Sequence, residues 1–136
     1  MFFKKEEIKD NNFLTKVCAL LIHAAKIDEN YTDKEEEIIR KTLNEFGVED
    51  INISKTIEDA KIIEESSNQI LDFTREAKRL PEQDKIKIIE ALWSIIYSNK
   101  DADIYETNLM RRLAGLLYID NKTMGDIKEK IKQNSK

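Results

Sequence analysis

Residues 96–117 read IYSNKDADIYETNLMRRLAGLL, and this stretch decides the fold. It joins the end of one helical pattern, a short acidic loop and a second helical pattern. Residues 24–46, AAKIDENYTDKEEEIIRKTLNEF, repeat this plan in a register that aligns Glu35 with Glu106. We therefore predict two related helical hairpins that pack around a pseudo-twofold axis, with residues 49–86 inserted between them.

Outside these hairpins, apolar residues recur every three or four residues, which is the spacing of one helix face. Gly47 is a stop signal for one helix, and Pro81 ends one helical stretch and begins another. The acidic segment 49–54 is predicted to be a loop. The prediction is an all-α, compact bundle of six to seven helices. The apolar residues of the expected helices lie within residues 13–27, 38–46, 57–77 with a break at 66–68, 86–97, 109–117 and 124–131.

The composition supports one soluble domain. The chain has 136 residues, of which 37% are charged and 40% hydrophobic, with three Gly and one Pro. These values disfavour a disordered chain, a membrane protein and a turn-rich β-fold. We expect a single domain over residues 1–136, with its core at about 13–120 and peripheral segments at both ends.

The net charge of −4 gives no electrostatic reason to bind nucleic acid. Residues 28–65 alone carry a net charge of −8, either as a solvated surface or as a patch for cations or a basic partner.

The longest apolar run, Val17 to Ala25, is too short to span a bilayer, and no secretory signal precedes it. The chain is thus expected to be cytoplasmic and not transmembrane, with the lysine-rich residues 122–136 as a candidate for peripheral contact with anionic lipid.

No catalytic set is visible in the sequence. His23 and Cys18 are the single residues of their kinds, and both lie in an apolar helical run. Five residues of helix place them about 140° apart around the helix axis, which does not suit a thiolate–imidazole pair. The three glycines are isolated, so no phosphate-binding loop is present. We expect a protein that is not an enzyme.

The two acidic loops allow a metal interpretation, because carboxylate and amide oxygens are the ligands that Ca²⁺ and Mg²⁺ prefer. An EF-hand is excluded, since Ile104 stands where glycine is needed and Met110 where the bidentate glutamate belongs. Any cation site would therefore have another geometry. The candidate metal ligands are Asp28, Glu35, Asn99, Asp101, Asp103 and Glu106.

The same residues also allow a purely structural interpretation. Thr32 with Glu35, and Asp103 with Glu106, have the spacing of capping boxes at helix N-termini. The arginines that follow the loops have two interpretations as well. Arg111 and Arg112 are candidate interaction residues that clamp the acidic loop of the other hairpin, whereas Arg40 in the equivalent place can pair with Glu36 one turn earlier.

These motifs resemble the TerB family of tellurite-resistance proteins over roughly residues 13–120. The second half resembles the family pattern at Leu92-Trp93, at Glu106 and in the run Arg111-Arg112-Leu113-Ala114. The first half has a similar spacing from Asp28 to Glu35. The chain departs from the family at Asn99-Lys100, where an Asp-Gly pair is usual, and this removes one charge from the second loop.

The resemblance implies an all-helical fold of about seven helices with pseudo-symmetric halves. It also implies a non-enzymatic role in binding or scaffolding, of the tellurite-resistance and stress-response type. The leading hypothesis is an interaction domain with an unidentified protein partner, whose acidic loops bind Ca²⁺ or Mg²⁺. The alternative is a pure protein–protein adaptor without ligand, similar to the TerB-like domain of a DnaJ-like co-chaperone.

Overall fold

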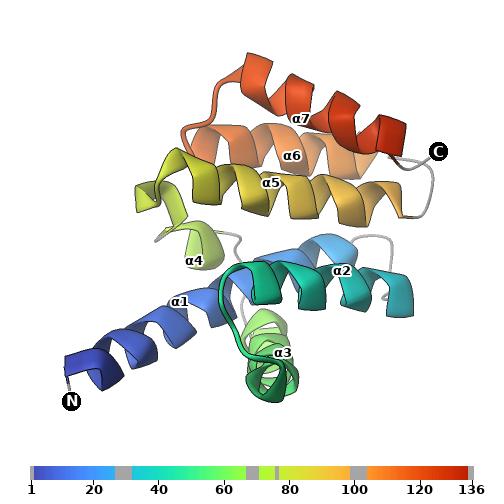
Figure 1. The fold of residues 1–136 in the computed structure, drawn as a ribbon. Helices are drawn as coiled ribbons and strands as arrows, with labels where there is room; N and C mark the ends of the chain where they lie inside the picture. Colours follow the sequence, from blue (N-terminus) through green and yellow to red (C-terminus); the bar gives the residue numbers. More distant parts are fainter. Residues whose placement is uncertain (1, 27–31, 67–70, 76, 99–103, 135–136) are drawn as a thin grey trace.

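The computed structural model describes residues 2–26, 32–66, 71–75, 77–98 and 104–134, with residues 2–12, 71–72 and 104–107 described in their backbone only. No strand occurs in these ranges, so the predicted all-α fold is confirmed. The elements are α1 (Phe2–Ala25), α2 (Asp33–Glu45), α3 (Asp50–Ser66), the one-turn α4 (Leu71–Thr74), a 3₁₀ turn (Ala77–Arg79), α5 (Glu82–Tyr97), α6 (Ile104–Leu116) and α7 (Asn121–Asn134) (Figure 1).

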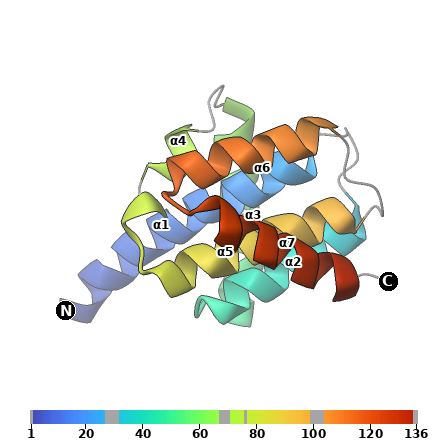
Figure 2. The ribbon, with the colours of Figure 1, turned by 90° about the horizontal axis from the view of Figure 1, so that it is seen from above.

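Helices α1 and α5 form the centre of the bundle. Helix α3 packs on α1, and α7 packs on α5, over which it lies in the view from above (Figure 2). Helix α2 contacts α1, α3 and α5, and the short α4 contacts α1 and α6. As a result, α3 lies on one side of the molecule and α6 with α7 on the other (Figure 1).

The apolar run in α1 explains why this helix is central. All residues from 17 to 22 are at most 1% exposed, so this part of α1 is covered on every side. A helix that is hydrophobic all round belongs in a core, whereas a helix at the surface shows a one-sided stripe. Helix α5 adds a second fully buried set, which includes Ile88, Ile89 and Leu92.

Helix α2 ends in the way that Gly47 predicts. Gly47 has a φ of 95°, in the left-handed region that glycine adopts at no steric penalty. The Val48 amide donates to the carbonyl of Leu43 at 3.0 Å, and both side chains are buried. This is a Schellman motif with its hydrophobic contact.

Helix α6 ends in the same motif without a glycine. The Ile119 amide donates to the carbonyl of Ala114 at 2.9 Å, and Tyr118 takes the left-handed position with a φ of 57°. Tyr118 aligns with Gly47 in the register that pairs Glu106 with Glu35. The same turn is therefore built once with glycine and once with a large aromatic residue.

The helix boundaries follow the same alignment of the two repeats. Helix α2 begins and ends at positions that align with the first and last residues of α6, and the first residue of α3 aligns with that of α7. Each repeat therefore contains three helices, because α3 belongs to the first repeat. The predicted insertion of residues 49–86 is too long, since only residues 67–81 lie between α3 and α5. The pseudo-twofold relation of the hairpins in space stays a prediction.

One predicted boundary is wrong. The segment 49–54 is not a loop, because α3 begins at Asp50. Ile53 is 4% exposed and begins the stripe that continues through Ile57 and Ala60, while Asp50 places a negative charge at the positive end of the helix. Helix α1 begins at Phe2, ahead of the apolar face that starts at Phe13. Among the described helices, none combines the length and apolarity that crossing a bilayer requires.

Candidate functional site

The structure describes only part of the predicted cation site. Asp28, Asn99, Asp101 and Asp103 lie outside the described residues. Glu106 lies in the first turn of α6, where only the backbone is described. Glu35 is the candidate ligand whose side chain is described, and the site is therefore built from this residue.

Glu35 forms a capping box with Thr32 at the start of α2. The Glu35 amide donates to the Thr32 hydroxyl oxygen at 3.2 Å, and the Thr32 amide donates to Oε1 of Glu35 at 2.8 Å. The Thr32 hydroxyl also donates to Oε1 of Glu35 at 3.0 Å. The structural interpretation of Glu35 is thus confirmed.

Glu35 is unusual for a capping residue because it is only 1% exposed. Burial of a carboxylate is unfavourable unless hydrogen bonds and charges compensate for lost water. The cap supplies such hydrogen bonds, and the N-terminus of α2 supplies a favourable dipole. The carboxylate is therefore held in one orientation at the start of α2.

We expect Glu35→Ala to lower the free energy of unfolding by about 1–2 kcal/mol, because the cap is lost and a Thr32 amide loses its partner. Urea unfolding followed by circular dichroism measures this change. Glu37→Ala is the matched control, since Glu37 is exposed on the same helix and its substitution removes the same charge. Equal stability of the two variants would contradict a capping role.

The arginines of the two repeats differ in what surrounds them. Arg40 Nε lies 3.8 Å from Glu36, and Arg40 Nη2 donates to the Ser54 hydroxyl at 3.0 Å. The predicted pairing one turn apart is thus confirmed for Arg40. Arg111 and Arg112 are both exposed on α6, and the acidic loops that they were predicted to clamp lie outside the described residues.

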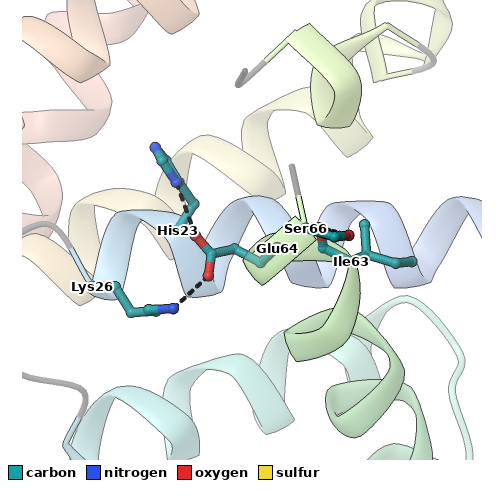
Figure 3. A network of polar contacts seen from close by, with 5 residues as sticks. All are labelled: His23, Lys26, Ile63, Glu64 and Ser66. Atoms are coloured by element: carbon teal, nitrogen blue, oxygen red, sulfur yellow. Dashed lines mark hydrogen bonds and ion pairs between the residues drawn. The ribbon is translucent and has the colours of Figure 1, made fainter. Parts of the chain in front are cut away.

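A polar cluster that the sequence did not predict joins α1 to α3 (Figure 3). The side chain of Glu64 is 10% exposed and accepts from Lys26 Nζ at 2.6 Å through one oxygen. Its other oxygen lies 3.2 Å from Nδ1 of His23. The His23 ring lies 6.4 Å from the ring of Phe73, centroid to centroid, and is not a core residue since its side chain is 38% exposed.

The environment of Glu64 favours its charged form. Burial alone would raise the pKa of Glu64, but the hydrogen bonds and charges of Lys26 and His23 outweigh burial and lower that pKa. The sequence held one signal for this cluster. Glu64 follows Ile53, Ile57 and Ala60 at the spacing of one helix face, and this face of α3 is buried. A buried acidic side chain needs a hydrogen-bond partner.

The other reactive groups of α1 do not form a catalytic pair. Cys18 is fully buried, and burial raises the pKa of its thiol to about 12. A thiol with this pKa is not a nucleophile at neutral pH. Within the ranges that the structure describes, no three His, Cys, Asp or Glu residues are grouped as a metal centre.

An open groove of about 600 Å³ lies between α2, α5 and α7. Its apolar floor includes Ile38, Ala91 and Ile131, and lysines and glutamates of opposite charge alternate along its walls. Across it, Lys130 Nζ lies 3.4 Å from Glu90. The groove has the size of a ligand or peptide site, but its lining offers no converging catalytic groups.

The family comparison agrees with the resemblance of the motifs. The family model described as tellurite resistance protein TerB matches residues 14–129. No curated protein and no solved structure matches the chain. The match covers all of the structured repeats except the first part of α1 and the end of α7.

Proposed function

The chain belongs to the TerB family of tellurite resistance proteins, and on this basis we propose that it is a non-enzymatic interaction domain of the tellurite-resistance and stress-response type. We further propose that its acidic interhelical segments bind a divalent cation, Ca²⁺ or Mg²⁺. The ligands in the first repeat are Asp28 and Glu35, and those in the second repeat are Asn99, Asp101, Asp103 and Glu106.

One observation carries the cation proposal, namely the burial of Glu35 at the start of α2. The residue is 1% exposed and its carboxylate is fixed by the capping box, so an ion would meet an oriented ligand. Residues 27–31 precede the N-cap Thr32 and contain Asp28, Glu29 and Asn30. Hard oxygen ligands of this kind suit Ca²⁺ and Mg²⁺ better than Zn²⁺.

The proposal that the protein is not an enzyme rests on the surroundings of its two reactive side chains, Cys18 and His23. The buried thiol of Cys18 has a raised pKa, and His23 is engaged with Glu64. Both residues contribute to packing or to the contact between α1 and α3. Binding and scaffolding remain as the functions that this arrangement supports.

Calorimetric titration with Ca²⁺ and Mg²⁺ tests the cation proposal. We expect weak binding to the wild type, with Kd of about 10⁻⁴ to 10⁻³ M, and its loss in Asp28→Asn. Asp28 is the better test residue, because a change of Glu35 also removes the helix cap. The control is Asp33→Asn, an exposed residue in the first turn of α2. Absence of heat at millimolar ion, or equal binding by Asp28→Asn, would refute the proposal.

The alternative is a protein–protein adaptor without a ligand. The capping box favours this alternative, because its hydrogen bonds explain the buried position of Glu35 without a bound ion. Pull-down of partners from extract of the source cell, with and without chelator, separates the two proposals. Capture that chelator abolishes supports the cation-dependent domain. Capture that survives chelator, together with wild-type capture by Asp28→Asn, supports the adaptor.

A further inference from the structure

A group of basic residues gathers where α4 meets the C-terminal end of α6. A hollow of about 150 Å³ lies here, and none of the described residues that line it is acidic; they are Thr74, Arg75, Lys78, Gly115, Leu116 and Tyr118. Arg111 and Gly115 lie one turn apart on α6, and Tyr118 follows in the turn that ends this helix. We define the cationic face as Arg75, Lys78, Lys85, Arg111, Arg112 and Tyr118.

The positive charges of this face are available for a partner. Arg75, Arg111 and Arg112 are exposed, and none of them forms an ion pair with another described residue. Lys85 Nζ lies 5.8 Å from the centroid of the Tyr118 ring, which brings the start of α5 to the same surface. The face as defined therefore combines five basic side chains with one aromatic ring, and Lys85, Arg75 and Lys78 are the basic residues that lie near this ring.

Tyr118 indicates that this surface is used for contact. Its side chain is 72% exposed although its backbone takes the left-handed conformation that the first repeat gives to Gly47. For a non-glycine residue this conformation is unfavourable, and the exposed ring gains little burial in return. Residues held in such a conformation cluster at functional sites.

A complementary surface lies on α3, which is on the other side of the molecule from α6 (Figure 1). Ile51 and Ile62 are 82% and 66% exposed, and they lie about three full turns apart, on the same side of the helix. Exposed acids lie near them on the helix, together with the exposed Lys55 and with Lys61, whose Nζ lies 3.6 Å from Glu36. We define the acidic face as Ile51, Glu58, Asp59, Ile62 and Glu65.

We propose that the acidic face of one copy of this chain binds the cationic face of a second copy. Opposite charges on the two faces steer the encounter, and the isoleucines of α3 supply the apolar contact for the Tyr118 ring. Because the two faces are different surfaces of the same chain, the contact is head to tail. Repetition of such a contact gives a ring or an open chain of copies.

Sedimentation of the full chain over a range of concentrations, with chelator present, tests this proposal. We expect concentration-dependent association at about 50 mM salt and monomers at about 1 M salt, where charges are screened within a few ångströms. A wild type that stays monomeric at low salt overturns the proposal, as does association that salt does not weaken. Binding to anionic vesicles without self-association also overturns it, because lipid would then be the partner of the cationic face.

Two variants that each break one face make the test specific. Arg111→Glu/Arg112→Glu reverses two of the five charges of the cationic face, and Glu58→Lys/Asp59→Lys reverses two of the three charges of the acidic face. We expect each variant alone to associate at least about tenfold more weakly than the wild type, and their mixture to associate again. Association of either variant at wild-type strength, or a mixture that stays monomeric, contradicts the proposal.

The control variant is Lys34→Glu/Lys132→Glu, which changes the net charge as the arginine variant does, at exposed positions outside both faces. We expect it to associate like the wild type, and circular dichroism verifies that all variants are folded. Equal loss of association in this control would assign the effect to net charge and overturn the proposal. The inference uses none of the candidate cation ligands, so its failure leaves the cation titration unaffected.

Discussion

Ile22→Ala is expected to lower the free energy of unfolding by about 2–5 kcal/mol. Ile22 is 1% exposed on α1, the helix that contacts α2, α3, α4 and α5. Truncation leaves a cavity that several helices would have to move to fill, and they can do so only in part. Because domains of this size are stable by about 5–15 kcal/mol, the loss is a large share of the total. Urea unfolding followed by far-UV circular dichroism measures it.

Ile51→Ala is the matched control for this prediction. It removes the same atoms from a side chain that is 82% exposed, so the expected loss is within about 0.5 kcal/mol. The protein is kept dilute, so that contact between copies does not contribute. Similar losses in the two variants would contradict the central position of α1.

Glu64→Gln is expected to lower the free energy of unfolding by about 1–3 kcal/mol at neutral pH, since the hydrogen bonds from Lys26 and His23 lose the carboxylate charge. We expect a value near the lower limit, because the Lys26 and His23 side chains are 42% and 38% exposed. The pKa of Glu64 is lowered in the folded protein, so the folded state favours the charged form. The stability that this charge contributes is therefore present above about pH 4.5 and is lost as the pH falls through the folded pKa.

Urea unfolding of wild type and Glu64→Gln between about pH 7 and pH 3 measures this dependence. The two proteins should differ at pH 7 and converge at low pH, as Glu64 becomes neutral in the wild type. Glu65→Gln is the control, since Glu65 is the exposed neighbour on the same helix. A difference that does not shrink on acidification would show that packing, and not charge, accounts for the role of Glu64.

Most of the fold could be predicted from the spacing of apolar residues. The strongest signals were local, such as Gly47 at the end of α2 and Pro81 before α5, and both are confirmed. The error at 49–54 has a physical cause. Ile53 was too isolated among acidic residues to indicate a helix, and its burial depends on α1, which α3 crosses.

In the candidate site, too, contacts between residues close in the sequence could be predicted and contacts between distant residues could not. The capping box of Glu35 could be predicted because its partner lies three residues away and helix geometry fixes their distance. The cluster of Glu64 could not, because its partners lie 38 and 41 residues away in the sequence. Only the crossing of α3 over α1 brings these side chains together, and no local pattern specifies that crossing.

The three-helix repeat has a consequence for the order of folding. Each repeat packs helices that are separated by one other helix, α1 with α3 across α2 and α5 with α7 across α6. The contact of α1 with α5 joins segments that are farther apart in the sequence, so its loop-closure entropy is larger. We therefore infer that the two repeats form before they dock.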